Sequence, residues 1–434
     1  MAATTTFKLL LEQLVEEAGT GDVLPGVTGT TTGITLANAY AAGPFPNQRY
    51  ARGSPILTTA GTAINEATFV NQYTASTGVF TITPSVSGTF TDAIIIPFSI
   101  GIDHPDRLKE AINRALTKRC YRWEPRPLTY VPDGDLQGTT VTDYWTAAAN
   151  GTPAYASAQV FPAGSAADAV GQTSFNRFLQ LTTSGGSSSV DGNGIRVVAS
   201  NEQRAWYFQT TIRLVSGAGT AEFKVRDNTN SADITLQVTR GNDTNTLTTT
   251  TFGDFMVCEG TFQLPATCAE IAPRLSLSAT GQVAQMGPVI MFPQQATRFP
   301  LPNRVVSQDD IGNFHQVYSG NSGSFNQTIS TEALTTGGLA HRLEDYGDHM
   351  TVSFNFRPTR PVYYMEAVYG TSLSAMTDTT TFPANHVMRW AKYELYKWLY
   401  DRDEKWKMKV YEAKKAADRF DVRHLQEPTI VGRV

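Results

Sequence analysis

Hydrophobic residues recur at helical spacing in two short segments of the N-terminal third. The first segment covers residues 7–17, where apolar residues fall on one face and Gly19 with Gly21 ends the run. The second begins near Pro105, whose missing N–H costs nothing in the first turn of a helix. Its apolar stripe consists of Leu108, Ala111, Ile112, Ala115 and Leu116. The pattern therefore predicts two amphipathic helices in this third of the chain.

Between these helices the pattern changes to short runs of alternating apolar and polar residues. The runs cover residues 55–59, 67–73, 78–83 and 92–99, and Gly, Ser and Thr residues separate them as turns. This arrangement predicts a small antiparallel β unit.

From about residue 141 to residue 292 no window has a convincing helical period, and the pattern is that of strands. The candidate strands are residues 178–182, 194–198, 206–215, 221–227, 234–239, 253–263 and 272–278. Seven strands separated by polar turns predict a β sandwich or jelly roll of about 150 residues. Residues 293–302 contain three prolines and are interpreted as a return linker, and the following segment carries two further strands at 350–356 and 361–368.

The last helix, predicted over residues 385–424, has two apolar faces. Met388, Ala391, Leu395 and Leu399 form one stripe, and a row of aromatic residues lies on another side. A surface helix needs only one apolar face, so two faces predict burial against a neighbour, which is often another subunit. The candidate subunit-interface residues are Trp390, Tyr393, Tyr396, Trp398 and Tyr400.

Charge density separates these regions. Only 17% of the 434 residues are charged, below the roughly 25% of an ordinary soluble protein. Residues 141–295 hold eleven acidic and eight basic residues, whereas residues 385–424 hold seven acidic and eleven basic ones. We therefore predict an α+β multidomain chain, a mixed helical and β body that carries an inserted all-β jelly-roll sandwich and a long C-terminal helix. The predicted segments are 1–138, 139–296, 297–384 and 385–434.

The overall charge and the cysteines exclude several classes of protein. A net charge of −4 gives no field that would attract nucleic acid or an anionic membrane. The N-terminus lacks the length of a signal peptide's apolar region, and no segment reaches the ~18 apolar residues of a membrane span. Cys120, Cys258 and Cys268 have no zinc or redox spacing. Cys258 and Cys268 could pair across a sheet, but three buried free thiols are the favoured interpretation.

No motif in the sequence carries chemistry. The six histidines have no metal-ligand spacing, and neither a nucleophile elbow nor a phosphate-binding loop is present. The Gly-rich stretches 184–187 and 191–194 lack the lysine and following helix of a phosphate loop and are predicted to be hairpin turns. We predict no catalytic residue, no cofactor and no metal, and we predict that the protein is not an enzyme.

Three alternatives remain open at this point. The stretches Asp133-Gly134-Asp135 and Asp191-Gly192-Asn193 could supply oxygen ligands to calcium, although turn positions explain the same residues. Trp145 and Trp206 could contact a glycan, although core positions are favoured. Glu202 and Glu222 could be paired glycosidase carboxylates only if the fold brought them to a suitable separation.

Several segments resemble virion proteins of tailed bacteriophages. Residues 52–63, 69–73 and 77–82, followed by residues 104–116, resemble a small β unit and helix that recur in those proteins, and residues 390–399 look like the terminal helix of neck and head-to-tail adaptor proteins. The middle region is similar to the carbohydrate-binding-module jelly rolls that phage structural proteins carry as insertions. The resemblance implies a head-to-tail connector located in the virion neck and made in the host cytoplasm. Its expected partners are copies of itself in a ring of twelve, portal and tail or neck proteins, and genomic DNA that passes through without being bound.

Two other functions compete with this expectation. The first is a glycan-binding tail-fibre, tail-tip or capsid decoration protein that attaches to a host surface through the jelly roll. The second is a polysaccharide hydrolase or lyase, which would need two acidic residues in one groove.

Overall fold

The computed structural model describes residues 5–36, 50–74, 78–156, 177–198, 204–240, 246–247, 256–305, 307–316, 339–347 and 349–424. Their contacts divide the chain into two units. Unit 1 comprises Met1–Arg122 and Val368–Thr429, and unit 2 comprises Trp123–Ala367 and Ile430–Val434. Mixed helices and sheets agree with the predicted α+β class. The division differs from the predicted segment boundaries, because residues 297–367 cluster with the sandwich rather than with the helices.

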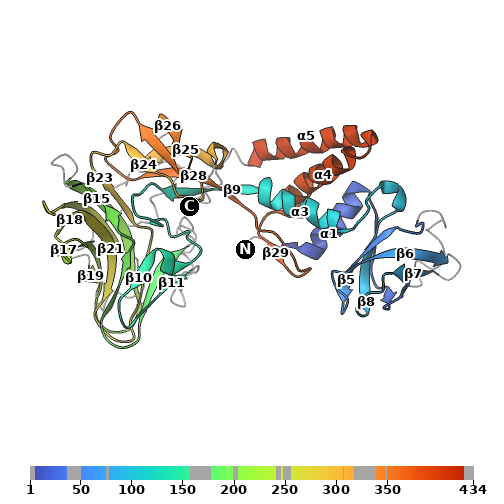
Figure 1. Cartoon of the computed structure of the whole chain (residues 1–434), viewed down its shortest axis with the longest axis horizontal. Helices are drawn as coiled ribbons and strands as arrows, with labels where there is room; N and C mark the ends of the chain where they lie inside the picture. The colour runs from blue at the N-terminus through green and yellow to red at the C-terminus, as the bar shows by residue number, and fades with distance from the viewer. Residues whose placement is uncertain are drawn as a thin grey trace, which may run out of the picture. The chain divides into compact units, whose positions relative to one another are not determined.

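Unit 1 contains a small closed β barrel (Figure 1). Strand β8 pairs with β3 and with β5, so the order β8-β3-β4-β7-β6-β5 returns to β8, and β2 adds to β8. Closure satisfies strand edges that would otherwise be exposed. Gly29 permits the close β3–β8 approach, because a Cβ at this position would lie 2.5 Å from the Phe90 ring. The strands are β2 (Asp22–Leu24), β3 (Thr28–Gly29), β4 (Gly33–Thr35), β5 (Pro55–Gly61), β6 (Ala67–Thr74), β7 (Val79–Thr83) and β8 (Phe90–Ile95), which confirms the predicted antiparallel unit.

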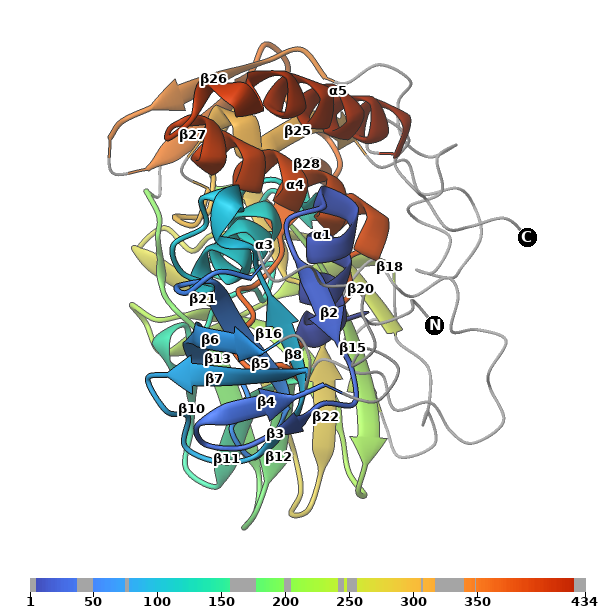
Figure 2. The same cartoon turned by 90° about the vertical axis from the view of Figure 1, so that its right-hand side faces the viewer.

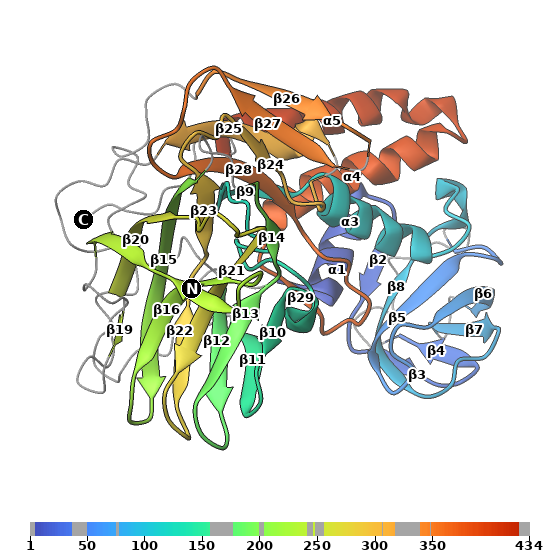
Figure 3. The same ribbon diagram turned by 60° about the vertical axis from the view of Figure 1, so that its left-hand side comes forward.

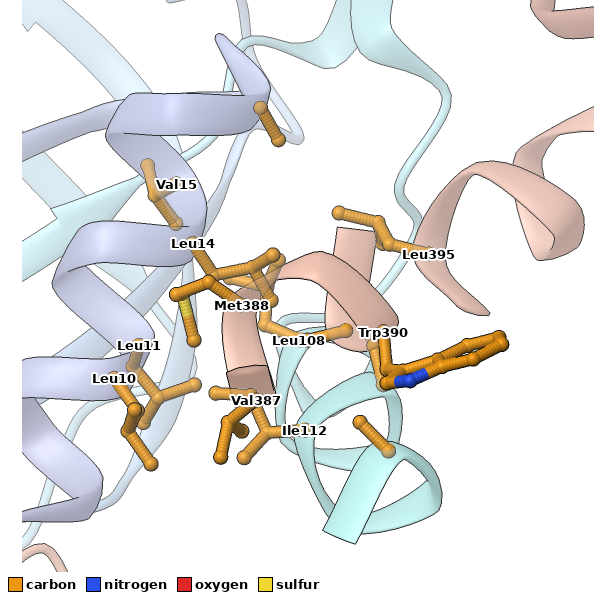
Figure 4. Packing of buried hydrophobic residues seen from close by; sticks show 14 of the residues in the cluster. Leu10, Leu11, Leu14, Val15, Leu108, Ile112, Val387, Met388, Trp390 and Leu395 are labelled. Atoms are coloured by element: carbon orange, nitrogen blue, oxygen red, sulfur yellow. The ribbon is translucent and has the colours of Figure 1, made fainter. Parts of the chain in front are cut away.

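Three helices of unit 1 share one hydrophobic core, α1 (Phe7–Ala18), α3 (Asp106–Lys118) and α4 (Ala384–Tyr400). Thr6 caps α1 by accepting a hydrogen bond from the Leu9 N–H, and Gly19 ends it in the left-handed conformation. All five predicted stripe residues of α3 are buried. Figure 4 shows Val387 and Met388 of α4 among side chains of α1 and α3, and Trp390 pointing away from α1. The two N-terminal helices are therefore confirmed. A short pairing of β1 (Thr5–Thr6) with β29 (Thr379–Thr380) lies beside α1.

The predicted single C-terminal helix is wrong, because the chain reverses after Tyr400. A short 3-10 turn at Glu404–Trp406 leads into α5 (Lys407–His424), which packs along α4. Asp403 caps the turn by accepting from the Lys405 N–H at 3.0 Å, and the Trp406 ring stacks on Tyr396 with centres 5.7 Å apart. Figures 1 and 2 show α4 between α5 on one side and α1 with α3 on the other. Part of the second apolar face of α4 is therefore buried against the same chain, whereas Tyr393, Trp398 and Tyr400 stay partly exposed. No described helix is long and apolar enough to cross a membrane.

Unit 2 is built on a sandwich of two antiparallel sheets (Figure 3). The first sheet has the order β10-β13-β21-β16-β17, with β14 and β19 attached, and the second has the order β11-β12-β22-β15-β20-β18, with β23 attached. Phe208 of β15 stacks on Phe223 of β16, with ring centres 5.6 Å apart, inside the shared core. The predicted sandwich is confirmed, and the jelly-roll connectivity stays a prediction.

The sandwich strands are β10 (Trp145–Ala147), β11 (Gly151–Ala156), β12 (Phe178–Thr183), β13 (Ser188–Gly192), β14 (Ile195–Arg196), β15 (Ala205–Ser216), β16 (Ala221–Asp227), β17 (Ala232–Ile234), β18 (Leu236–Arg240), β19 (Thr246–Leu247), β20 (Met256–Gln263), β21 (Glu270–Leu277), β22 (Val283–Met286) and β23 (Ile290–Pro293).

The two Gly-rich turns do not form the predicted hairpins. Residues 184–187 join β12 to β13, which belong to different sheets, so this turn crosses the sandwich. Residues 193–194 separate β13 from β14, and both of these strands pair with β21. The pairing is interrupted opposite Pro273, which has no N–H to donate to a neighbouring strand.

Two three-stranded sheets complete unit 2. The first is β24-β27-β26 and the second is β25-β28-β9. Their apolar side chains form one cluster with Tyr207 of β15 and with Ile290 and Phe292 of β23, which face away from the sandwich core. This shared core explains why residues 297–367 belong to unit 2. The strands are β9 (Tyr121–Pro127), β24 (Arg298–Pro300), β25 (Ile311–Gln316), β26 (His341–Asp345), β27 (Met350–Phe354) and β28 (Val362–Tyr369), and the last two confirm the predicted strands of this segment.

Candidate functional site

The hairpin between β26 and β27 presents an exposed aromatic side chain at its tip. Asp345 pairs with Met350, and the intervening turn places the Tyr346 N–H 3.0 Å from the His349 carbonyl. Asp345 accepts a hydrogen bond from the Gly347 N–H at 2.7 Å, and Gly347 has a φ of 86°, which glycine adopts without strain. The turn thus fixes the backbone on both sides of Tyr346.

The Tyr346 ring is held in one orientation although 53% of the residue is exposed. One face stacks on the His349 ring, with centres 5.2 Å apart and planes 15° from parallel. The hydroxyl donates a hydrogen bond to Glu344 Oε2 at 2.7 Å. Because the ring and the hydroxyl group both have fixed partners, the Tyr346 side chain loses little conformational entropy when a ligand packs on it.

Charged hydrogen-bonding groups surround this ring. Arg298 of β24 donates through Nη2 to Glu344 at 2.5 Å and to the Tyr346 hydroxyl at 3.3 Å. The Tyr346 hydroxyl, together with Arg298 and Arg342, holds the pKa of Glu344 below its ordinary value. Glu344 is therefore a carboxylate at neutral pH and acts as an acceptor beside the Arg298 guanidinium. We call Tyr346, His349, Glu344 and Arg298 the hairpin platform.

The chemistry of the hairpin platform suits binding. An aromatic ring with an exposed surface packs against apolar C–H groups, and adjacent carboxylate and guanidinium groups accept from and donate to hydroxyl groups. A general acid would need a carboxyl group that keeps its proton near neutral pH, whereas the lowered pKa of Glu344 keeps it ionised.

The two tryptophans predicted as possible glycan contacts lie in the sandwich core. Trp145 is completely buried, and its Nε1 donates to Asp133 at 3.4 Å. Trp206 is 3% exposed and stacks on Phe262. Neither ring presents a surface on which a sugar could pack, and both fit the core interpretation that the sequence favoured.

A second polar surface, the outer face of the β15 sheet, is buried in this structure. Gln209, Thr211 and Arg213 of β15 point away from the sandwich core, and Arg213 pairs in register with Gln285. The Gln285 amide donates to Gln180 at 3.0 Å, and Gln285 is 1% exposed. These amide and hydroxyl groups have the chemistry of a sugar site but are not accessible here.

The two loops considered for calcium have protein partners for their carboxylates. Asp133 accepts from the Gly138 N–H at 2.5 Å and from Tyr155 and Trp145, and Asp135 pairs with Arg304. Asp191 is bound by Arg274 through two hydrogen bonds of 2.5 and 2.7 Å. Among the residues that the structure describes, no group of three or more His, Cys, Asp or Glu side chains is placed to hold a metal ion.

Only one member of the acidic pair considered for catalysis belongs to the described residues, so the pairing stays a prediction. Glu222 forms an ion pair with Lys224 at 3.1 Å on the outer face of β16. Glu202 lies outside the described residues. The three cysteines are buried free thiols, which confirms the favoured prediction.

The predicted subunit-interface aromatics of α4 pack within unit 1. The Tyr396 hydroxyl donates to the Ala18 carbonyl at 3.2 Å, and Trp398 lies 4.0 Å from the Arg402 guanidinium carbon. Trp390 and Tyr393 both contact Arg119, and Tyr400 packs against the helical core. The subunit-interface role of these five residues stays a prediction.

Sequence reasoning missed the hairpin platform. The signal for it was the stretch Asp345-Tyr346-Gly347 between two strand patterns, because Asp and Gly favour a tight turn and a tyrosine at its centre points outward.

No protein-family model matches the sequence, and no curated protein matches it. Among solved structures, a xylan-binding domain of family 22 of carbohydrate-binding modules is similar at 9% identity over 38% of this chain and 92% of its own, with a TM-score of 0.24. The corresponding domain of Paenibacillus barcinonensis Xyn10C has 13% identity over 41% and 99%, with a TM-score of 0.24. The enzymatically active domain of tailspike protein 4 of bacteriophage CBA120 has 10% identity over 38% of this chain, with a TM-score of 0.27.

This chain spans only 26% of the arabinofuranosidase MgGH51 and 21% of the tailspike domain to which it is similar. At these TM-scores the likenesses are partial, and the function has to be argued from the residues of this chain.

Proposed function

We propose that this chain is a non-enzymatic glycan-binding protein of a phage virion, in the manner of a tail-fibre, tail-tip or decoration protein, and that it contacts its glycan through the hairpin platform. The observation that carries this proposal is the exposed, tethered ring of Tyr346 beside Glu344 and Arg298. The resemblance of residues 52–82 and 104–116 to virion proteins supports the location.

A sugar ring matches this platform in two respects. Its C–H groups form an apolar patch that packs on an aromatic ring, and its hydroxyl groups both donate and accept hydrogen bonds. Glu344 is an acceptor and the Arg298 guanidinium is a donor, and both are hydrogen-bonded to the Tyr346 hydroxyl. The low charge density of the sandwich, whose surface relies on Thr, Ser, Asn and Gly, adds a hydrogen-bonding environment without a strong net field.

The alternative of a ring-forming connector has less support. It was motivated by the low-charge β insert between two helix-bearing segments and supported by the second aromatic face of α4. Contacts from α5, Arg107 and Arg119 of the same chain account for part of that face. Among the residues that the structure describes, nothing favours a ring over a surface-exposed binding protein.

Binding of the full chain to a polysaccharide array tests the proposal. Tyr346→Ala should weaken binding to the recognised glycan by about tenfold or more, because the stacking surface is lost. Tyr346→Phe keeps the ring and loses only the hydroxyl's hydrogen bonds with Glu344 and Arg298, so it should weaken binding by about threefold.

Tyr411→Ala is the matched control, because Tyr411 is 62% exposed on α5 of unit 1. It should bind as the unmodified chain does. Absence of binding to any glycan, or equal affinities for Tyr346→Ala and the unmodified chain, would show that the platform is not a glycan site.

A further inference from the structure

One side of the sheet β24-β27-β26 carries a row of polar side chains beside the hairpin platform. Arg298 of β24 and Arg342 of β26 both pair in register with Ser353 of β27. Residues that pair directly in an antiparallel sheet point to the same side of it, so these three side chains form one row. Arg298 Nε donates to the Ser353 hydroxyl at 3.2 Å, which agrees with this arrangement. We call Arg298, Ser353 and Arg342 the polar row.

The opposite side of the same sheet is buried. Phe299, Val352 and Leu343 are sequence neighbours of the polar row and pair with one another in the same way. Phe299 and Val352 belong to the hydrophobic cluster of this part of unit 2, and Leu343 packs against it. The polar row therefore lies on the outer side of the sheet, where the side chains of Arg298 and Arg342 are 60% and 81% exposed.

The two arginines share one carboxylate, that of Glu344. Arg298 Nη2 binds Glu344 Oε2 at 2.5 Å, and Arg342 Nε lies 3.8 Å from Oε1. The contact found for the Arg342 guanidinium is this ion pair, which is longer than a hydrogen bond, so Arg342 keeps N–H donors for a ligand. One negative charge on a side chain that is only 15% exposed faces two exposed positive charges. The polar row and Glu344 together carry a net charge of +1.

Asp345 and His349 also border the polar row. Asp345 follows Glu344 in β26, so the alternation of a strand places it on the other side, and it accepts from the Gly347 N–H at 2.7 Å. His349 stacks on the Tyr346 ring, and a histidine side chain carries no negative charge in either protonation state. The excess of positive charge on the outer side of the sheet therefore remains.

A sugar that carries a carboxylate matches this combination of groups. The planar guanidinium group of an arginine binds both oxygens of a carboxylate at once. The Tyr346 hydroxyl donates to Glu344 Oε2, while Arg342 approaches Oε1 of the same group, so the ring and the guanidinium flank one side chain. A uronic acid has a ring with C–H groups for the tyrosine and a carboxylate for the arginine.

We propose that the glycan bound at the hairpin platform is acidic, and that Arg342 binds the carboxylate of a uronic acid whose ring packs on Tyr346. This inference rests on the proposed glycan-binding function and adds the chemical class of the sugar and a residue outside the platform that selects it. Arg298 offsets the charge of Glu344, which would otherwise repel an anionic ligand.

Binding of the full chain to six polysaccharides tests this inference. Alginate, polygalacturonate and hyaluronate contain uronic acids, dextran and pullulan are neutral, and dextran sulfate carries sulfate groups. At least one of the three uronic-acid polymers should bind more tightly than the other polymers. Chemical reduction of its carboxylates to alcohols should weaken that binding by about tenfold or more, because the charged acceptors of Arg342 are lost.

Substitutions of Arg342 identify the residue that selects the acid. Arg342→Gln should weaken binding of the uronic-acid polymer by about tenfold, and Arg342→Lys by about threefold, because lysine keeps the charge but lacks the planar donors. Neither substitution should weaken binding of the carboxyl-reduced polymer by more than about twofold, because the partner of Arg342 is already absent. Thermal unfolding of each variant establishes that it is folded.

Arg196→Gln is the matched control, because Arg196 is an exposed arginine of β14 in the sandwich of the same unit. Its effect on binding of the uronic-acid polymer should be less than about twofold.

The results that overturn the inference differ from those that overturn the proposed function. Binding of dextran or pullulan that is as tight as that of the uronic-acid polymers, and that is lost in Tyr346→Ala, would leave the platform a glycan site and remove the acidic class. Equal binding of dextran sulfate, or equal losses for Arg342→Gln and Arg196→Gln, would mean that charge alone attracts the polymers. Absence of binding to every polysaccharide would remove the inference and the glycan-binding function together.

Discussion

The guanidinium carbon of Arg119, at the end of α3, lies 5.2 Å from the centre of the Trp390 ring of α4. The same guanidinium is 5.7 Å from the Tyr393 ring, and its Nε donates to Glu394 at 3.3 Å. At the other end of α3, Arg107 lies 5.2 Å from the Trp398 ring. Cationic side chains at the two ends of α3 therefore contact three of the five aromatic residues of α4 that the sequence predicted to meet another subunit.

Substitution of Arg119 tests the consequence of this arrangement. Arg119→Gln should lower the free energy of unfolding by about 1 kcal/mol, because it removes the cation–π contacts and an ion pair at a half-exposed position. The mass of the particle in solution should not change. Urea unfolding and sedimentation measure the two quantities, with Arg342→Gln at an exposed position as the control. A change of oligomeric mass for Arg119→Gln alone would indicate that the aromatic row meets another subunit.

Substitutions of Trp206 and Tyr346 should differ in their effect on the free energy of unfolding, because the first residue is buried and the second is exposed. Trp206→Ala removes a buried indole that stacks on Phe262, so it should cost about 3–5 kcal/mol of unfolding free energy. Tyr346→Ala truncates an exposed side chain and should change that free energy by less than about 1 kcal/mol. Differential scanning calorimetry of both variants measures the difference. A large loss of stability for Tyr346→Ala would mean that its effect on glycan binding is indirect.

The helices of the N-terminal third could be predicted because their signals are local. Thr6 and Gly19 cap α1, and the apolar spacing of each helix identifies the buried face. The break between α4 and α5 could not be predicted in this way. It contains neither Gly nor Pro, and it depends on the packing of Trp406 against Tyr396, two residues that meet only after the chain has reversed.

The sandwich shows the same limit for strands. Long alternating runs such as β16 carry their own pattern, whereas β11 and β13 consist of small or polar residues and become strands by pairing with neighbours. The association of residues 297–367 with the sandwich has one local signal in the sequence. Trp206, Tyr207 and Phe208 are consecutive apolar residues, and a strand buried on both faces has that pattern.

The sequence predicts the type of candidate site, a glycan-binding surface, but not the residues that form it. Composition favours a neutral, hydroxyl-rich β module, but the tryptophans singled out in it are core residues. Exposure of Tyr346 depends on a turn and on three tethering contacts, from Glu344, Arg298 and His349, that come together only in the folded hairpin.

The buried thiols should be unreactive in the native protein. Burial raises the pKa of Cys258, and burial with the Asp227 carboxylate nearby raises the pKa of Cys268 to about 11, so neither forms a thiolate at pH 8. Native protein should react with less than about one equivalent of a thiol reagent at this pH, and unfolded protein should react with all three cysteines. Fewer than three equivalents after unfolding without reductant would indicate a disulfide and contradict the structure.

Asp92 should make unit 1 sensitive to acid. Its carboxylate binds Lys8 of α1 at 2.5 Å and the Gly26 N–H at 3.0 Å. Partial burial raises its pKa, but these hydrogen bonds and the Lys8 charge outweigh burial and hold the pKa of Asp92 below its ordinary 3.8. As the pH falls, Asp92 is therefore protonated in the unfolded chain at a higher pH than in the folded chain. The stabilisation by Asp92 is present above about pH 4 and is lost as the pH falls through the lower, folded-state pKa.

Asp92→Asn should lower the unfolding free energy at pH 7 by about 1 kcal/mol, and the two proteins should converge in stability below about pH 4. Urea unfolding between pH 3 and pH 7 measures the difference, with the exposed Asp401→Asn as the control. A difference that stays constant with pH would rule out the ion pair as its source.

Arg304 should be a costly charge to remove from unit 2. It binds Asp135 and also Glu366, with Nε 2.7 Å from Glu366 Oε1, and both carboxylates are buried. Burial lowers the pKa of Arg304, but these carboxylates raise it overall, so the guanidinium stays charged.

Arg304→Met should lower the free energy of unfolding by about 3–5 kcal/mol, because Glu366 keeps its ion pair with Arg126 while Asp135 becomes a buried carboxylate without its cation. The double variant with Asp135→Asn should recover more than about 1 kcal/mol of that loss, since the stranded charge is removed. Chemical denaturation of the single and double variants measures this coupling, and a loss for Arg304→Met as small as that of the exposed Arg342→Gln would refute it.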